Sequence, residues 1–230
     1  MKTLNQFHLD LFSEARDGDT VVAAHLLPPK GETVGLGTLF TLADGIDGFL
    51  TVNRDLISIW NGVTAEEAFN RKFNQNKLSL AEKIRKPHVE VYAYRREIRD
   101  CMVGLASPLV FTDASSGRKQ AIRTYWKYSL AVTSLDSLLR RINERGGRLT
   151  VGDCNELCRS SGGNLANILY RVLEEALRTV PLDSLRSVET EIGRKVMEQF
   201  NRAYAEELGL RIVSFQPGGI TPVNDGWKEL

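Results

Sequence analysis

The sequence predicts an α+β fold in which a β-rich N-terminal subdomain is followed by a helix-rich α/β subdomain. Short β-rich runs separated by Gly, Pro, Asn and Asp dominate residues 20–132, and helical periodicity takes over after Thr133. The hydrophobic fraction of 42% and the charged fraction of 26% are close to globular averages, so we expect the whole chain to fold. The expected organisation is a short amphipathic helix at 1–18, the β-rich subdomain at 19–134, the helical α/β subdomain at 135–217 and a tail at 218–230.

The N-terminal helix is predicted from four apolar residues at helical spacing, Leu4, Phe7, Leu11 and Phe12, which precede a stop at Gly18. Its polar face lacks the density of Lys and Arg that is typical of a helix lying on a membrane. We therefore expect the apolar stripe to dock on the protein's own domain or on a second subunit.

The next elements are predicted to be strands with one helix between them. The β-rich runs are Thr20–Leu27, Gly37–Leu42, Gly48–Val52, Leu56–Trp60 and Val89–Tyr94. Between the last two runs, Thr64 is followed three residues later by Glu67, which is a capping-box pattern. We expect a helix from this point to Phe73, covering an edge or a face of the sheet.

Two shorter helices are predicted after the β-rich part. Thr133 followed by Asp136, and Asp153 followed by Glu156, are helix start signals, and each helix is expected to end at a pair of glycines.

The clearest periodicity lies between Leu165 and Val180, where apolar residues recur in steps of three and four. This stripe predicts the central core helix. After Pro181, a longer helix from about Val188 to Leu208 is expected to end at Gly209 and to lead into a strand, Leu210–Phe215.

The order of these C-terminal elements resembles the second half of an SPFH (stomatin/prohibitin/flotillin, or band-7) domain. The resemblance covers roughly Val89–Phe215, and it is carried by Tyr125–Val132, Leu135–Ile142, Ser187–Val196 and Glu207–Val213. Gly104–Leu109 with Asp113 is similar to a segment of the bacterial virion-core-like group. The sequence departs from the family at Trp126, where many relatives have a small residue, and at Thr133-Ser134.

The resemblance implies a scaffold that oligomerises as a ring, cage or linear array, recruits protein partners and associates with a membrane, without catalytic chemistry. No apolar run approaches the roughly 20 residues that a spanning helix requires, so we expect any membrane contact to be peripheral. The odd number of cysteines, three, and the lack of a secretory signal favour a cytoplasmic protein. The net charge of +1 argues against a nucleic-acid partner.

Motifs for cofactors and metals are weak in this sequence. Cys154 and Cys158 have no second ligand pair at zinc spacing, and we interpret them as buried helix residues. The glycine-rich run 31–37 is followed by no Lys-Ser/Thr pair and is explained by a turn. We therefore expect no cofactor, no metal and no catalytic residue.

Two alternatives remain open at this stage. One is a small hydrolase or nucleotide-dependent enzyme whose site is assembled from distant residues, for example His88, Cys101 and Asp113. The other is a viral or phage-type structural subunit. For the scaffold, the candidate interface joins the N-terminal stripe to the charged face of the last helix, and its residues are Phe7, Leu11, Phe12, Glu189, Arg194, Glu198 and Arg202. We expect Trp60 and Trp126 to be apolar residues beyond the needs of the core.

Overall fold

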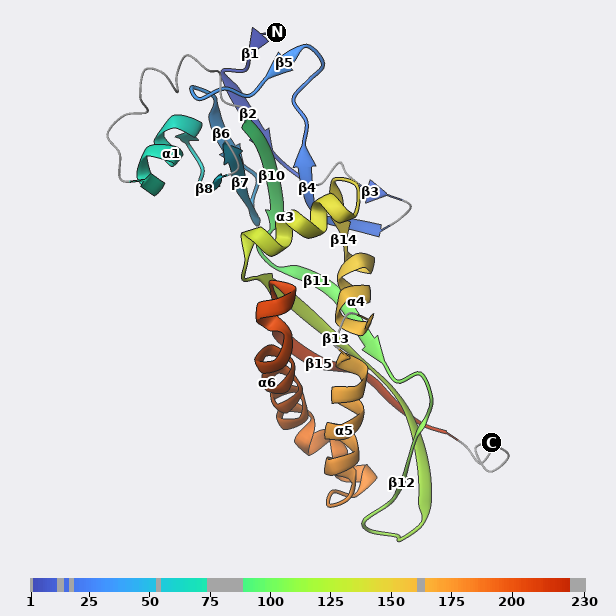
Figure 1. The fold of residues 1–230 in the computed structure, drawn as a ribbon. Coiled ribbons are helices and arrows are strands. Elements are labelled where there is room, and N and C mark those ends of the chain that lie inside the picture. The colour runs from blue at the N-terminus through green and yellow to red at the C-terminus, as the bar shows by residue number, and fades with distance from the viewer. Residues whose placement is uncertain are drawn as a thin grey trace. The chain divides into compact units, whose positions relative to one another are not determined.

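The computed structural model confirms the α+β class and divides the chain into two compact units (Figure 1). The structure describes residues 2–11, 15–16, 19–52, 55–73, 89–160 and 164–223. Unit 1 contains residues 1–96 and 135–150, and unit 2 contains residues 97–134 and 151–230. The chain does pass between the units at the predicted boundary of residues 134 and 135, but the predicted pair of contiguous subdomains is wrong, because each unit is built from two separate stretches of chain.

The main sheet of unit 1 is antiparallel and has the strand order β14-β4-β10-β7-β8. Its strands are β4 (Asp19–Leu26), β7 (Ile46–Val52), β8 (Asp55–Ile59), β10 (Val89–Arg95) and β14 (Arg148–Thr150), and β3 (Ala15–Arg16) pairs with β4. Four of the predicted strands are confirmed here within one or two residues. The prediction did not include β14, whose pairing with β4 brings residues 148–150 back to the N-terminal part of the chain.

A second group of strands packs on this sheet through a shared apolar core. β2 (Gln6–Leu9) runs parallel to β6 (Leu39–Leu42), which also pairs with β9 (Val63–Thr64), and β1 (Lys2–Thr3) pairs with β5 (Glu32–Thr33). The approach is close at Gly48, where a Cβ atom would lie 2.5 Å from Leu9 Cδ2. Glycine is therefore required at this point of β7 for Leu9 to reach the core.

The predicted helix at 1–18 is wrong, because its described residues include strands instead. Phe7, Leu9 and Leu11 alternate along an extended chain, and all three are buried in the core of unit 1. Phe7 and Leu11 are four residues apart and also fit a helix, but the period of two that includes Leu9 matches the pairing of β2 with β6. Phe12, the last residue of the predicted stripe, lies outside the described residues.

Two of the described helices belong to unit 1, and both were predicted. α1 (Ala65–Phe73) begins with the expected capping box: Thr64 N–H donates to Glu67 Oε2 over 2.8 Å, and Glu67 N–H donates to Thr64 Oγ1 over 3.2 Å. α3 (Leu135–Glu144) packs on β14 and β4 through a face that buries Leu138 and Ile142.

Unit 2 is built around one long strand, β13 (Lys119–Val132). β15 (Leu210–Pro222) pairs with β13 from Val132 to Ile122, so β11 (Ile98–Gly104) and β12 (Leu109–Thr112) must follow each other along the opposite edge. The predicted strand from Leu210 is confirmed, but it is longer than expected. Residues 218–222 belong to β15, and the predicted tail therefore does not begin at 218.

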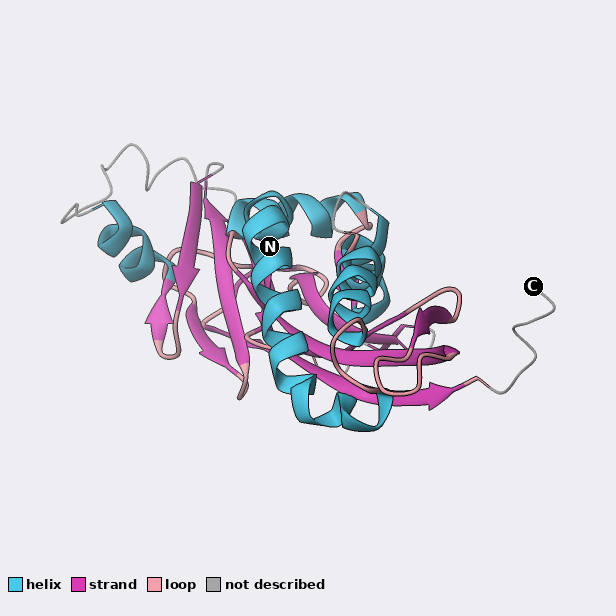
Figure 2. Ribbon diagram, turned by 90° about the horizontal axis from the view of Figure 1, so that it is seen from below, coloured by secondary structure: helices cyan, strands magenta, loops and turns pink. Residues whose placement is uncertain are grey.

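Helices cover one face of the unit 2 sheet, as the cyan helices beside the long C-terminal strands show in Figure 2. They are α4 (Val151–Ser160), α5 (Leu165–Leu177), the 3₁₀ helix η1 (Leu182–Val188) and α6 (Glu189–Leu208). α5 buries six apolar residues and is confirmed as a core helix. α6 ends, as predicted, at Gly209, whose φ of 68° is left-handed.

The face of the sheet under these helices carries the core of unit 2. Trp126 has no exposed surface and packs on Phe215 with ring centroids 5.3 Å apart, so its predicted excess over core needs is wrong. Gly193 of α6 allows the close approach, because a Cβ atom there would lie 2.6 Å from the Phe215 carbonyl oxygen. Trp60, in unit 1, is 38% exposed and stacks under the Arg71 guanidinium.

Candidate functional site

The second face of the unit 2 sheet is open to solvent and is the first candidate surface. Between Ile122 and Tyr128 the side chains of β13 alternate: Thr124, Trp126 and Tyr128 are buried under the helices, whereas Arg123 and Lys127 are exposed on the other side. Direct pairing places neighbours on the same face. We use the name open sheet face for seven of the exposed residues on this side: Met102, Val110, Arg123, Tyr125, Lys127, Arg211 and Val213.

Tyr125 forms the centre of the open sheet face. Its ring lies across the two glycines of β15, since a Cβ atom on Gly218 would lie 2.1 Å from Tyr125 Cε2 and one on Gly219 would lie 3.0 Å from Cε1. The ring still exposes 45% of the residue's surface. Beside it, Lys127 pairs with Met102 on one strand and Gln216 on the other, all three exposed. The face therefore combines apolar area with cationic groups.

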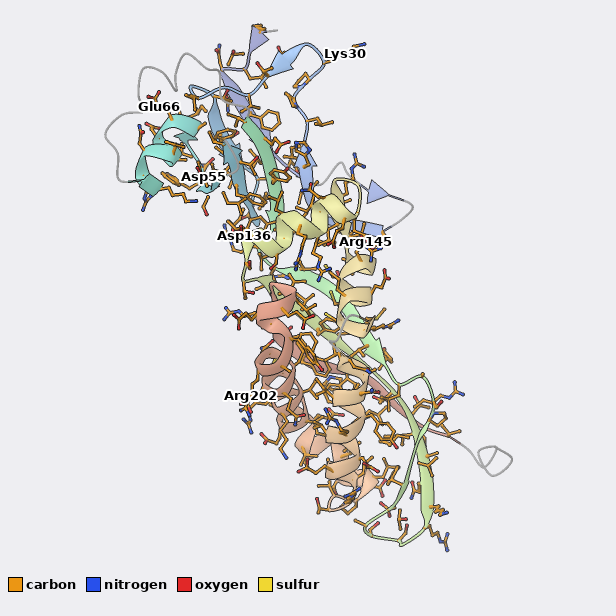
Figure 3. The ribbon with its side chains drawn as sticks, viewed as in Figure 1. Lys30, Asp55, Glu66, Asp136, Arg145 and Arg202 are labelled. Atoms are coloured by element: carbon orange, nitrogen blue, oxygen red, sulfur yellow. The ribbon has the colours of Figure 1, made fainter. Side chains whose placement is uncertain are left out.

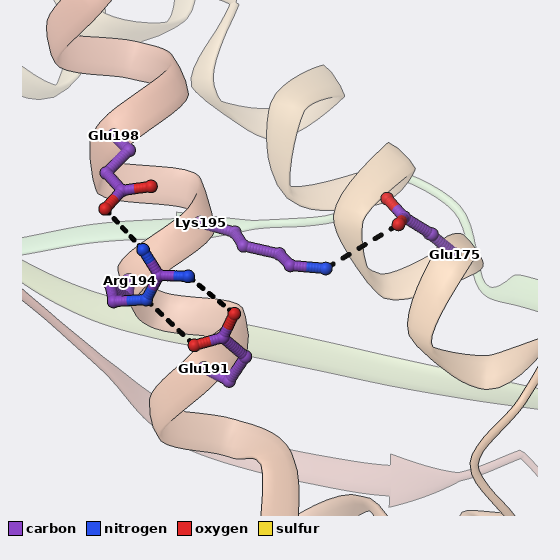
Figure 4. A network of polar contacts seen from close by, with 5 residues as sticks. All are labelled: Glu175, Glu191, Arg194, Lys195 and Glu198. Atoms are coloured by element: carbon purple, nitrogen blue, oxygen red, sulfur yellow. Dashed lines mark hydrogen bonds and ion pairs between the residues drawn. The ribbon is translucent and has the colours of Figure 1, made fainter.

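The outward side of α6 is the second candidate surface, and it carries the charged residues that the sequence predicted. Arg194 donates to Glu191 over 2.7 Å and also bonds Glu198, while Lys195 reaches Glu175 of α5 over 3.6 Å (Figure 4). These bonds raise the pKa of Arg194 and lower that of Glu191. Because every member of the network is well exposed to solvent, it contributes little to stability.

Acidic groups exceed basic groups on α6. The helix contains five glutamates (189, 191, 198, 206 and 207) and three basic residues (Arg194, Lys195 and Arg202), which gives a net charge of −2. Arg202 extends from the helix on its outer side (Figure 3). Glu206 and Glu207 lie in the last turn, where the helix dipole disfavours negative charge. No basic residue lies in that turn to offset them.

The seven predicted interface residues therefore divide into three groups. Glu189, Arg194, Glu198 and Arg202 lie together on α6, with Glu189 partly buried and the other three exposed. Phe7 and Leu11 are core residues of unit 1 and do not form an interface. Phe12 is outside the described residues. Sequence reasoning missed the open sheet face, although the alternation of Arg123, Tyr125 and Lys127 with buried neighbours was a readable signal.

The three cysteines are all buried around one tyrosine in unit 2. Tyr128 forms a hydrogen bond with Cys158 and donates one to Asn155 Oδ1 over 2.9 Å. Cys101 and Cys154 lie close enough to raise the pKa of Tyr128. Burial is the largest cause of the raised pKa of Tyr128. Burial also raises the pKa of the Cys158 thiol, to about 11. Within the described part of the chain, no group of three His, Cys, Asp or Glu side chains is arranged to hold a metal ion.

The catalytic group suggested by the sequence, His88, Cys101 and Asp113, is not assembled as far as its described members show. Cys101 and Asp113 lie far apart. Cys101 pairs with Tyr128 of β13. Asp113 directly follows Thr112, the last residue of β12, and Thr112 pairs with Lys119 at the far end of β13. Nine residues of extended strand span roughly 30 Å. His88 lies outside the described residues.

Asp113 instead has a structural position at the β12–β13 turn. Its Oδ2 accepts bonds from Ser115 Oγ, Ser116 N–H and Ser116 Oγ over 2.6–2.9 Å, and its Oδ1 accepts from Leu182 N–H over 3.0 Å. These donors hold the pKa of the carboxyl far below its usual range. The side chain therefore ties the hairpin to the start of η1.

Comparisons with known proteins add no relative. No protein-family model matches the chain, and no curated protein is significantly similar to it. Among the described helices, none combines the length and the apolar character needed to cross a bilayer.

Proposed function

We propose that the protein is a non-catalytic scaffold that self-assembles head to tail through unit 2. In this proposal, the open sheet face of one copy docks on the outward side of α6 of the next copy. The observation that carries the proposal is the bare sheet face itself. It exposes Met102, Tyr125 and Val213 by 40–47% beside the cations of Arg123, Lys127 and Arg211.

Charge complementarity supports a second copy as the occupant. The open sheet face presents three cationic side chains, and α6 has a net charge of −2. Glu206 and Glu207 place negative charge at the helix C-terminus, where it destabilises the helix. Residues that are unfavourable for their own helix are expected where they serve binding. Complementary charges steer association and fix its register, while the apolar groups around Tyr125 supply the buried area.

The placement of the two surfaces determines the symmetry of assembly. α6 packs its buried side on the covered face of the sheet, with Gly193 against Phe215 and Trp126, so its outward side and the open sheet face lie on opposite sides of unit 2. A contact between unlike surfaces is heterologous, and it produces a ring or an open filament rather than a closed two-fold dimer.

The resemblance to SPFH domains supports the same proposal, because it implies ring, cage or linear oligomers. We extend the proposal accordingly to a cytoplasmic protein that recruits protein partners and contacts a membrane peripherally. A viral or phage-type structural subunit would use the same head-to-tail contact, so a test of self-association applies to both roles.

Sedimentation velocity across a concentration series is the decisive measurement. The wild type should form species larger than a monomer. Arg123→Glu with Lys127→Glu should weaken association by reversing the sheet face. Glu206→Lys with Glu207→Lys should weaken association by reversing the charge on α6. The fold should remain at least as stable, because each lysine at the helix C-terminus interacts favourably with the helix dipole, by roughly 0.3–1 kcal/mol. A loss of association in the second variant therefore has no explanation in unfolding.

Mixing the two variants provides the control for head-to-tail geometry. Each reversed surface then meets its reversed complement, and the unchanged surfaces also match, so the equimolar mixture should associate like the wild type. A strictly monomeric wild type would contradict the proposal. So would retention on single-stranded DNA without self-association, lost in the Arg123→Glu and Lys127→Glu variant, since this result would assign the open sheet face to nucleic acid.

A further inference from the structure

A cleft of about 600 Å³ opens within unit 2, on the side of the helices. It lies where the last turn of α4 and the first turns of α5 meet α6. Its lining residues are Arg159, Asn164, Asn167, Ile168, Tyr170, Arg171 and Tyr204. The volume falls in the range of small-molecule sites.

Positive charge dominates this cleft. Two guanidinium groups, those of Arg159 and Arg171, line it, and no Asp or Glu is among the described residues of its wall. Arg159 makes one long contact, 3.5 Å to the Met102 carbonyl oxygen. Arg171 has no hydrogen-bond or ion-pair partner within the described part of the chain, in contrast to Arg178, the C-cap residue of α5, which lies 3.6 Å from Glu174. The guanidinium of Arg171 is therefore available to an anion.

Neutral donors accompany the two cations. Asn164 is the N-cap residue of α5, but its side chain makes no capping bond, so its amide is free to turn toward the cleft. Asn167 supplies a second amide one turn later. Guanidinium and amide N–H groups together match the several acceptor oxygens of a phosphate, for which planar, bidentate donors are favoured.

Two aromatic rings complete the lining. Tyr170 exposes 39% of its surface at the cleft, and Tyr204 is held by Phe200, with ring centroids 5.6 Å apart. Their exposed faces offer area on which a flat ring can stack, while Ile168 forms an apolar floor. A ligand that joins an anionic oxygen group to a planar ring fits both halves of the lining.

We propose that this cleft binds a small soluble phosphate ester that carries a planar ring, such as a nucleoside monophosphate. Arg159 and Arg171 bind the phosphate, the amides of Asn164 and Asn167 complete its hydrogen bonds, and the ring rests beside Tyr170 and Tyr204.

Calorimetric titration of the full chain with AMP tests this inference. We expect saturable binding that Arg159→Gln and Arg171→Gln each weaken at least about tenfold, because each removes a charge-assisted contact. Arg178→Gln is the matched control: it lies on the same side of the same helix and should leave AMP binding unchanged. Tyr170→Leu should weaken binding of AMP but not of inorganic phosphate.

Several outcomes would overturn the inference. These are no saturable binding of AMP, equal binding in the wild type and in both arginine variants, and equal affinity for AMP and inorganic phosphate. Binding to phosphatidylcholine vesicles that contain phosphatidic acid, with no binding of AMP, would assign the arginines to a lipid headgroup and would also overturn it. Association of the chain is measured separately, because Arg159 and Arg171 lie outside the proposed contact.

Discussion

The side-chain amide of Asn201 pairs with both backbone groups of Ile212. Ile212 N–H donates to Asn201 Oδ1 over 2.8 Å, and Asn201 Nδ2 donates to the Ile212 carbonyl oxygen over 2.9 Å. The amide thus occupies the position of a neighbouring strand at the outer edge of β15. A helix residue closes part of a sheet edge on which another chain would otherwise pair.

Replacing this amide should destabilise unit 2 and open its edge. In Asn201→Leu, two backbone groups of the buried residue Ile212 lose their partners, at a cost of about 1–3 kcal/mol. The urea midpoint should fall, and aggregation on heating should increase. Gln199→Leu, an exposed substitution on the same helix, serves as the control and should leave both measurements near the wild-type values. Equal midpoints for the two variants would show that the pairing has no energetic importance.

Asp113 should make the stability of unit 2 depend on acid. Its pKa is far below the usual range in the folded protein, so its contribution is present above about pH 4, the unfolded value, and is lost as pH falls toward the folded pKa. Asp113→Asn should be less stable than the wild type at pH 7. The difference in urea midpoint should shrink as pH falls from 4 to 2.5, because protonation removes the same charge from the wild type. Parallel pH curves would contradict this prediction.

The buried thiols should be inert in the folded protein. Burial raises the pKa of Cys158 to about 11, and Cys101 and Cys154 have no exposed surface. The thiolate is the reactive form, so Ellman's reagent at pH 8 should modify the thiols only as the protein unfolds. In urea, three thiols per chain should react. A thiol that reacts rapidly under native conditions would revive the hypothesis of a cysteine nucleophile.

The double variant Cys154→Ala with Cys158→Ala separates a structural role from a functional one. We expect lower stability, because two buried side chains lose volume, but unchanged association in sedimentation. Loss of a bound metal or of any activity in this variant would favour an enzyme.

The core helix α5 should be sensitive to truncation of its buried side chains. Leu169 and Leu173 have no exposed surface, and Leu→Ala at either position should cost about 2–5 kcal/mol. Arg178→Ala on the same helix should change the free energy of unfolding by less than about 0.5 kcal/mol, because its side chain is 72% exposed. A urea midpoint unchanged in both leucine variants would show that α5 is not a core element.

The parts of the fold that sequence could predict are those fixed by local signals. The stripe of α5, the capping box at Thr64 and Glu67 and the glycine after α6 involve residues within a few positions of each other, and all three were confirmed. The pairing of β14 with β4 depends on contacts between distant segments. No local pattern encodes such a contact, so the sequence did not show that residues 135–150 belong to unit 1 and residues 97–134 to unit 2.

The candidate surfaces show the same division. The charges of α6 were predicted, because helical spacing alone places Glu191, Arg194 and Glu198 together. The open sheet face was not predicted, because which side of β13 is covered depends on where the helices pack. Trp126 illustrates the difficulty: its size suggested surface use, but its place in the alternation puts it under α6.

The N-terminal segment should be required for the fold of unit 1. If the N-terminal stripe were part of an interface, as the sequence suggests, removal of the residues before Asp19 would weaken association and leave the fold intact. The structure reverses this expectation, since Leu9 has no exposed surface, Leu11 is 1% exposed and β2 pairs with β6 along its whole length.

The truncated chain should therefore melt at a much lower temperature or fail to fold. Leu9→Ala in the full chain is the milder test, with an expected cost of about 2–5 kcal/mol, because the side chain fills the space above Gly48. His8→Ala is the matched control, since His8 is exposed on the opposite side of the same strand and bonds only at the surface to Thr41. Thermal melting and sedimentation should be recorded together. A truncated chain that keeps the wild-type melting temperature but no longer associates would restore the N-terminal segment to the interface and would contradict its place in the core of unit 1.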